Sequence, residues 1–168
     1  MKIEPGDVAV VTGAASGIGA GLARAARRRG MRVVIADIDD AALVRVAAEL
    51  GEGALAVPTN VADPDAVDRL AARAYEAFGQ VDLLFNNAGV MATGKSWEID
   101  LDRWRRSVDV NIMGLVHGAK SFVPRMISAG RRAHIVNTAS VGGFAASPLM
   151  APYSDDPLHF APLRELRR

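Results

Sequence analysis

The sequence predicts an α/β protein: a doubly wound parallel sheet of about five strands with helices on both faces. The first observation behind this prediction is that short apolar segments alternate with segments of helical spacing between residues 7 and 140. The second is that the short segments are apolar at nearly every position, as expected of strands covered on both faces. No repeat or low-complexity tract interrupts the alternation.

The first half of the chain supplies three predicted strand–helix pairs. We expect strands at 7–12, 32–37 and 54–60, and helices at 16–29, 39–51 and 63–79. The third helix has clear ends, because Asp63 can cap it, Pro64 suits its first position and Gly79 can end it. The inward stripes of the three helices are expected, in order, at Ile18, Leu22, Ala25 and Ala26; at Leu43, Val46, Ala47 and Leu50; and at Val67, Leu70, Ala71, Ala74 and Phe78.

The second half of the chain supplies two further strands and a longer helix. Strands are expected at 81–89, where VDLLFNNAG runs into a polar turn, and at 133–140. A helix over 101–128 is expected, with Pro124 kinking or shortening its last turns. Its core stripe would consist of Trp104, Val108, Ile112, Leu115, Ala119, Phe122 and Met126. After residue 141 the chain is rich in proline and has no period, so we expect a domain over 1–154 and an irregular Pro- and Arg-rich tail over 155–168.

Composition limits the possible functions. With 50% hydrophobic and 23% charged residues, the chain is typical of a soluble globular domain. Its net charge of +1 favours neither nucleic acid nor a membrane as a partner, and the arginine clusters at 27–29 and 103–106 are interpreted as solvated helix faces. The absence of cysteine excludes disulfides, thiolate chemistry and cysteine-based zinc sites. The apolar run near the N-terminus is too short for a signal or membrane segment, so a cytoplasmic protein is expected.

The segment VVTGAASGIGAG joins the first predicted strand to the first predicted helix. Gly13, Gly17 and Gly19 space its glycines as Gly-x-x-x-Gly-x-Gly, and Ser16 can add a hydroxyl donor. Glycine permits positive φ and a close approach of phosphate to the backbone, and the amides that open a helix attract an anion. Because the motif follows a strand and opens a helix, it predicts a Rossmann-type domain that binds a dinucleotide. Tight packing without a ligand is the alternative explanation of the glycines.

Asp37 indicates which dinucleotide is bound. It ends the second predicted strand, close to the spacing of about 20 residues at which an acidic side chain accepts hydrogen bonds from the adenosine ribose. A carboxylate there repels a 2′-phosphate, and no lysine or arginine follows it closely. NAD is therefore favoured over NADP. The alternative is that Asp37 caps the next helix, but Asp39 or Asp40 can take that role and leave Asp37 free.

Five motifs in order along the chain resemble the short-chain dehydrogenase/reductase family. They are TGAASGIG at 12–19, NNAG at 86–89, Asn111, Ser140 at the end of the fifth predicted strand, and Tyr153. The resemblance covers roughly residues 7–154. It implies a Rossmann-type fold, here expected to be incomplete on its C-terminal side, and hydride transfer between a nicotinamide cofactor and a small-molecule alcohol or carbonyl substrate.

The resemblance also implies roles for individual residues. The pyrophosphate and nearby ribose would be held by Gly13, Ser16, Gly17, Ile18 and Gly19. The adenine would be contacted by Asn60, which stands where the family usually has aspartate, and by Val61. The length of the cofactor would be followed by Asn87, Ala88 and Gly89. In the reaction, Asn111 would anchor a water of a proton relay. Ser140 would hydrogen-bond the substrate oxygen, and Tyr153 would exchange a proton with that oxygen.

The sequence departs from the family pattern just after Tyr153. Reducing a carbonyl needs a proton donor at the developing alkoxide, and a tyrosine serves near neutral pH when a nearby cation lowers its pKa from about 10. The resemblance implies a lysine for this purpose, one helical turn after the tyrosine. Pro157 occupies that position, after Asp155 and Asp156, and proline also argues against a continuing helix.

Two functions therefore stay open. The first is an NAD-preferring oxidoreductase of this family that acts on an alcohol or ketone. The alternative is a catalytically impaired dinucleotide-binding fragment, or a partner subunit whose site another chain completes. No metal, nucleic-acid or membrane partner is expected. We do expect a homo-oligomer or a self-associating chain, because the strand at 133–139 would lie at an edge of the sheet, and the helix at 101–128 belongs, by the resemblance, to the family's dimerisation surface.

Overall fold

The computed structural model describes residues 2–140 together with Gly142 and Leu149. In this part of the chain five parallel strands form one sheet in the order β3-β2-β1-β4-β5. The strands are β1 (Val8–Thr12), β2 (Arg32–Asp37), β3 (Ala54–Pro58), β4 (Leu83–Asn86) and β5 (His134–Asn137). The predicted parallel α/β fold is confirmed, although the last three strands are shorter than predicted.

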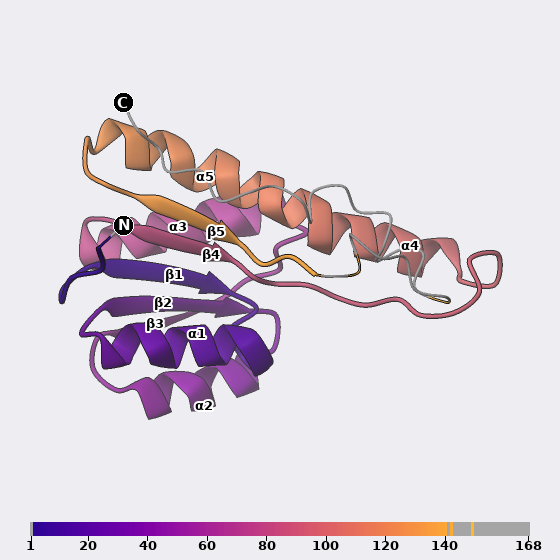
Figure 1. Ribbon diagram of the computed structural model, residues 1–168, viewed down its shortest axis with the longest axis horizontal. Coiled ribbons are helices and arrows are strands. Elements are labelled where there is room, and N and C mark those ends of the chain that lie inside the picture. The colour runs from indigo at the N-terminus through magenta and orange to yellow at the C-terminus, as the bar shows by residue number, and fades with distance from the viewer. Residues whose placement is uncertain (1, 141, 143–148, 150–168) are drawn as a thin grey trace.

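The helices lie in two layers, one on each face of the sheet (Figure 1). One layer contains α1 (Gly17–Arg28) and α2 (Asp40–Leu50), and the other contains α3 (Pro64–Phe78) and α5 (Gly114–Ser128). Between β4 and α5 the chain forms α4 (Leu101–Val108) and a short π-helix, η1 (Asp109–Met113). None of the helices in the described ranges is both long and apolar enough to cross a membrane.

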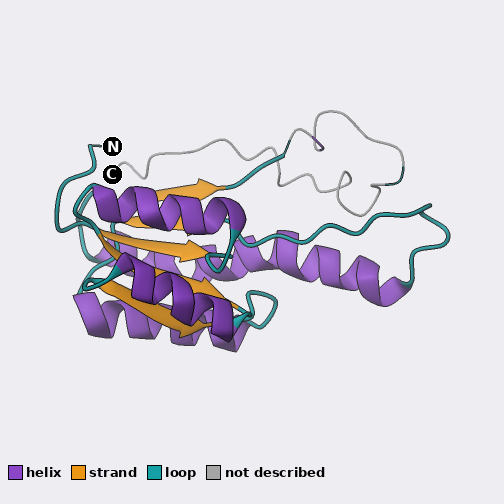
Figure 2. Cartoon of the chain, turned by 90° about the horizontal axis from the view of Figure 1, so that it is seen from below, coloured by secondary structure: helices purple, strands orange, loops and turns teal. Residues whose placement is uncertain are grey.

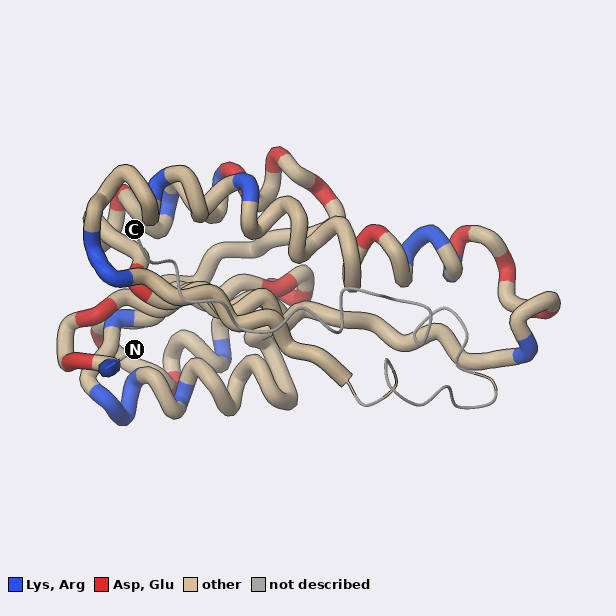
Figure 3. The backbone as a smooth tube through the Cα atoms, turned by 45° about the horizontal axis from the view of Figure 1, so that its top comes forward, with Lys and Arg blue, Asp and Glu red and all other residues tan. Residues whose placement is uncertain are grey.

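The central strands are buried because each of their faces packs against a helical layer. Alternate residues of β1 belong to different cores: Val8 and Val10 pack with α3 and α5, whereas Ala9 and Val11 pack with α1 and α2. A strand side chain points to the opposite face from its neighbour, so a strand between two helical layers is apolar at every position. Charged residues lie on the helices and loops, around the uncharged central strands (Figure 3).

The predicted helix ends are confirmed. The Asp39 side chain accepts a hydrogen bond from the Ala42 amide at 2.9 Å, and the Asp63 side chain accepts one from the Asp65 amide, also at 2.9 Å. Gly79 ends α3 with a φ of +73°, a left-handed conformation that favours glycine. Since Asp39 caps α2, the alternative in which Asp37 caps this helix is wrong.

The predicted inward stripe of α1 needs correction. Ile18 is 67% exposed, and Leu22 and Ala25 are only half-buried. The residues of α1 that are buried against the sheet are Gly19, Ala20, Ala23 and Ala26. The stripe is therefore rotated toward smaller residues, because the helix begins close to the loop after β1 and leaves no room for a large side chain there. The predicted stripe of α3 is confirmed, with Phe78 half-buried at its end.

The long helix predicted over 101–128 is divided by η1, and only the last two residues of its predicted core stripe are fully buried, since Ile112, Leu115 and Ala119 are half-buried. Phe122 and Met126 are fully buried, but Trp104 is half-buried and Val108 is 40% exposed. The reason is position: α4 projects past the end of the sheet, where no other described strand or helix covers it (Figure 2). Pro124 lies inside α5, which continues to Ser128 and is not shortened.

Strand β5 has a hydrogen-bonded neighbour on one side only, β4, among the residues that the structure describes. Its outer backbone groups are a template for pairing with another chain. We expect the purified protein to self-associate, and apolar side chains exposed along α4 and η1, such as Leu101, Val108 and Met113, should add to this tendency. Sedimentation velocity at micromolar concentrations measures it. A monomer that is independent of concentration and does not bind a hydrophobic dye would contradict the expectation.

Candidate functional site

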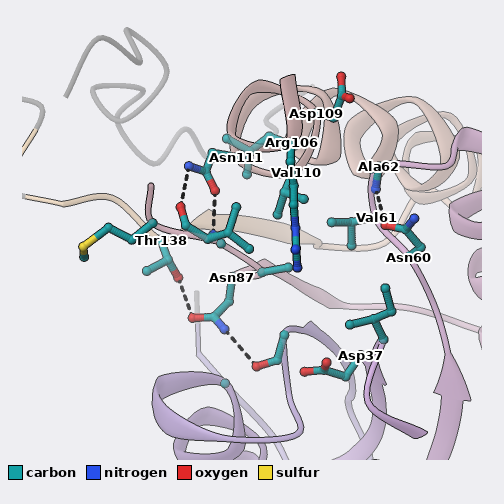
Figure 4. A pocket seen from close by; sticks show the side chains of 18 of the residues that line it. Asp37, Asn60, Val61, Ala62, Asn87, Arg106, Asp109, Val110, Asn111 and Thr138 are labelled. Carbon is teal, nitrogen blue, oxygen red and sulfur yellow. Dashed lines mark hydrogen bonds between the residues drawn. The ribbon is translucent and has the colours of Figure 1, made fainter. Parts of the chain in front are cut away.

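A cleft of about 830 Å³ opens at the carboxyl ends of the strands. Open parallel sheets bind ligands at this end, where the loops after neighbouring strands meet. The lining includes every residue that the sequence assigned to cofactor binding: Gly13, Ser16, Gly17, Ile18, Gly19, Asp37, Asn60, Val61, Asn87, Ala88 and Gly89. Residues from four separate loops are thus brought to one site, while α4 and η1 form its outer wall (Figure 4).

Two of the three motif glycines are required by packing inside the protein. A Cβ atom on Gly13, whose φ is +64°, would lie 2.7 Å from the Ala88 Cα. A Cβ atom on Gly19 would lie 2.7 Å from the Asn87 Nδ2 and would overlap the carbonyl oxygen of Gly13. These glycines let the loop after β1 lie directly against the turn after β4.

Gly17 differs from the other two glycines. Its φ is +52°, yet a Cβ atom there would meet no atom of the protein within 4 Å. Ser16, beside it, is exposed and makes no side-chain capping bond to α1. The start of α1 therefore faces the cleft with room in front of its first amides, where the helix dipole favours an anion. Contact with the turn after β4 accounts for Gly13 and Gly19, whereas Gly17 is favoured by its positive φ and faces open space.

Asp37 stands at the end of β2 and already holds two backbone amides. Its Oδ2 accepts a hydrogen bond from the Ala15 amide at 2.9 Å, and its Oδ1 accepts one from the Asp39 amide at 3.1 Å. The prediction that Asp37 is left free is therefore wrong in part. A carboxylate has about four acceptor positions, so two remain for hydroxyl groups of a ligand. The bond to Ala15 also fixes the carboxylate against the glycine loop.

The turn after β4 is held by two threonines that the sequence analysis did not single out. The Thr12 hydroxyl oxygen accepts hydrogen bonds from the amides of Asn87 and Ala88, at 2.9 and 3.1 Å. The Asn87 side chain donates to the Thr12 carbonyl oxygen at 3.0 Å. It also accepts a hydrogen bond from the Thr138 hydroxyl at 3.0 Å (Figure 4). Asn87 thus connects β1, β4 and β5. The available signal was that Thr12 ends one short strand and Thr138 directly follows another, at the same edge of the sheet.

Asn111 is buried within η1 and fixes the segment that follows this turn. Its Oδ1 accepts a hydrogen bond from the Val90 amide at 2.8 Å, and its Nδ2 donates to the Val90 carbonyl oxygen at 3.0 Å. The same Nδ2 donates to the Ser107 hydroxyl at 3.2 Å. π-helices occur frequently at functional sites. Both amide hydrogens of Asn111 are used within the protein, so its side chain has a structural role whatever else it does.

Asn60 and Val61 form the end of the cleft beyond β3. The Asn60 Oδ1 accepts a hydrogen bond from the Ala62 amide at 3.1 Å, and the Val61 carbonyl oxygen pairs with the Nδ1 of His117 at 2.9 Å. The Val61 side chain is buried against Gly114, where a Cβ atom would lie 3.0 Å from Val61 Cγ2. Val61 thus adds an apolar surface, supported by α5, to this end of the cleft.

The structure brings together only part of the predicted catalytic set. Asn111 lines the cleft, as do Thr138 and Ala139, which lead to Ser140. The Ser140 hydroxyl oxygen lies just beyond this lining and accepts a hydrogen bond from the Gly142 amide at 3.1 Å. Tyr153 and Pro157 lie outside the described residues, as does the predicted tail at 155–168.

Comparison with known families and proteins identifies the family. The family described as short chain dehydrogenase matches residues 7–155. The chain belongs to the short-chain dehydrogenase/reductase family. It is 46% identical, over 151 residues, to 1-deoxy-11-beta-hydroxypentalenate dehydrogenase of Streptomyces arenae, a match that covers 87% of this chain and 54% of that protein.

Two solved structures of this family resemble the fold closely. The crystal structure of a short chain dehydrogenase/reductase from Burkholderia phymatum in complex with NAD has a TM-score of 0.90 and 44% sequence identity, over 92% of this chain and 56% of that one. The structure of 3-ketoacyl-(acyl-carrier-protein) reductase from Brucella melitensis complexed with NADH has a TM-score of 0.85 and 35% identity, over 89% and 63%. The chain spans about half the length of the curated relatives it matches.

Proposed function

We propose that the chain binds NAD(H), in preference to NADP(H), as the cofactor-binding part of an oxidoreductase acting on a small-molecule alcohol or ketone. The observation that carries this proposal is the cleft itself, because eleven residues chosen from the sequence line one cavity. Two solved relatives hold NAD or NADH, which supports the same cofactor class here. We place the binding domain at 1–154, with 155–168 as a tail, and expect it to act in the cytoplasm.

The residues present fit such a cofactor. Gly17 and Ser16 leave open space in front of the first amides of α1, where phosphate oxygens would accept hydrogen bonds. Asp37 keeps acceptor positions for ribose hydroxyls, and the buried Val61 offers an apolar surface to adenine. When bound, the nicotinamide would supply the hydride chemistry that side chains cannot perform.

The remaining residues would act on the substrate. Ser140 would donate a hydrogen bond to the substrate oxygen, and Tyr153 would deliver a proton to that oxygen during reduction or remove it during oxidation. Asn111 would anchor a water that returns protons to Tyr153. Its Oδ1 accepts one hydrogen bond, from the Val90 amide, so a second lone pair on Oδ1 is left to accept from that water.

A second candidate function follows from Pro157. With proline where the family resemblance places a lysine, the chain would bind the dinucleotide but transfer hydride slowly. It would then serve as a binding fragment, or as a subunit whose partner supplies the missing cation. The two functions share the same cofactor cleft and differ only in turnover, so a rate measurement separates them.

The cofactor preference is tested by titrating the chain with NADH and NADPH. We expect NADH to bind at least about tenfold more tightly, because the Asp37 carboxylate would face the 2′-phosphate as one negative charge against another. Asp37→Ala should narrow the difference, and it should also weaken NADH because the hydroxyl acceptors are lost. Asp40→Ala, which changes an exposed carboxylate outside the cleft lining, is the matched control and should change neither affinity. Superimposable titration curves for the two cofactors on the unmodified chain would overturn the preference.

A further inference from the structure

The outer wall of the cleft carries charges that the cofactor residues already described do not explain. Asp102, Arg105, Arg106 and Asp109, from α4 and the start of η1, all line the cavity. Figure 3 shows acidic and basic residues close together along this projecting helix. The sequence interpretation of 103–106 as a solvated face is therefore incomplete, since two of its arginines border the binding site.

The two arginines differ in what they contact. Arg105 forms an ion pair with Asp102 at 3.2 Å, so its charge is already balanced. Within the part of the chain that the structure describes, the Arg106 guanidinium forms no ion pair and no hydrogen bond. Asp109, three residues later, could pair with it on a helix surface. Figure 4 instead shows the two side chains extending in opposite directions, with Arg106 directed toward the centre of the cleft.

The opposite wall needs a positive charge when a dinucleotide binds. No lysine or arginine of the described chain lines the cleft apart from Arg105 and Arg106, and Asp37 adds a negative charge beside the glycine loop. A pyrophosphate brings two more negative charges. The helix dipole of α1 offsets only about half of one elementary charge. Among the described lining residues, the unpaired guanidinium of Arg106 is the basic group that can offset part of this negative charge.

We propose that Arg106 is a cofactor-binding residue whose guanidinium donates hydrogen bonds to phosphate oxygens of the dinucleotide, from the wall opposite the glycine loop. Arginine suits this role because its planar group presents five donors and remains charged at all working pH values. A hydrogen bond between two charged groups is about twice as strong as one between neutral groups. The inference rests on the proposed dinucleotide binding and adds a contact to the phosphates that the glycine motif does not provide.

The experiment compares ligands with and without phosphate. ADP and adenosine compete with NADH, and NADH binding is followed by its fluorescence. Arg106→Ala should weaken NADH and ADP by about tenfold or more, but should leave adenosine within about twofold, because adenosine has no phosphate. Arg106→Lys should keep part of the affinity for ADP, because lysine retains the positive charge but lacks the planar guanidinium that can form two parallel hydrogen bonds. The salt dependence of ADP affinity should be shallower in Arg106→Ala than in the unmodified chain.

Arg105→Ala is the matched control, since Arg105 lies beside Arg106 on the same wall but is paired with Asp102. It should change ADP affinity by no more than about twofold. Thermal unfolding of all variants should be nearly unchanged, because these side chains are exposed. An equal loss for adenosine and ADP, or the same ADP affinity in Arg106→Ala and Arg105→Ala, would overturn the assignment. If the unmodified chain binds neither NADH nor ADP, the proposed function fails together with this inference. If it binds both, and Arg106→Ala binds them as tightly as the unmodified chain does, only this inference fails.

Discussion

Replacing Gly19 with alanine should destabilise the folded chain by roughly 3 kcal/mol and weaken NADH binding by at least about tenfold. The new methyl group would overlap the Gly13 carbonyl oxygen and press on the Asn87 side chain. Asn87 cannot move aside easily, because its backbone amide donates to the Thr12 hydroxyl and its side-chain oxygen accepts from the Thr138 hydroxyl. The start of α1 would have to move away from the loop and carry its amides with it. Urea unfolding and NADH fluorescence titration measure the two effects.

Gly21→Ala is the matched control, two residues further along the same helix. A Cβ atom on Gly21 meets nothing within 4 Å, so alanine there should stabilise the helix by about 0.5–1 kcal/mol and leave NADH binding unchanged. Comparing Gly19→Ala with Gly21→Ala separates the general effect of an alanine in α1 from the effect of its contact with the loop after β1. Normal stability and normal NADH affinity in Gly19→Ala would show that the loop and the turn after β4 are not held together as described.

The second large effect concerns turnover, which we expect to lie about 10²–10⁴-fold below that of a full-length relative assayed in parallel. The reason is Pro157, which cannot provide the cation that would activate Tyr153. Initial rates with NAD and a panel of alcohols, and with NADH and the matching ketones, measure this directly. Pro157→Lys alone should recover little, because the lysine must also stand on a helix, and a further proline at 162 argues against one.

Tyr153→Phe is the control for this prediction. Any residual rate in the unmodified chain should survive the substitution if Tyr153 does not act as the acid or base. A rate close to that of the relative, lost in Tyr153→Phe, would show instead that another group activates the tyrosine. In that case the oxidoreductase function would hold in full, and the binding-fragment alternative would be wrong.

Much of the cofactor cleft could be predicted from the sequence because its residues follow strand ends. A parallel sheet brings the carboxyl ends of its strands to one edge, so the positions of Gly13 and Asp37 in the chain were enough to place them together. Asn60 was assigned to the same site by the family resemblance. The caps at Asp39 and Asp63 were predictable for a similar reason, because a cap depends on neighbours within three residues. Local chemistry and a simple topology decided these features.

Features that depend on packing between distant segments could not be predicted in this way. Trp104 and Val108 have the spacing of core residues, but α4 extends beyond the sheet and leaves them partly exposed. Ile18 is exposed because Gly19, and not a larger residue, must face the loop. The supporting role of Thr12 depends on a turn that lies far away in the sequence. In each case the surroundings of the side chain depend on a part of the fold that the spacing of neighbouring residues does not reveal.

The π-helix at Asp109–Met113 has a consequence for changes of chain length. Each residue of an α-helix turns the chain by about 100°, and a π-helix accommodates one extra residue in its turn. Deleting that one extra residue would restore a regular α-helix and would leave the helices on either side in phase, so Phe122 and Met126 would stay in the core. Asn111 lies inside the π-turn, and its bonds to Val90 and Ser107 depend on the wider turn. A deletion in this segment should therefore cost little stability in α5 but should loosen the wall of the cleft that Asn111 holds.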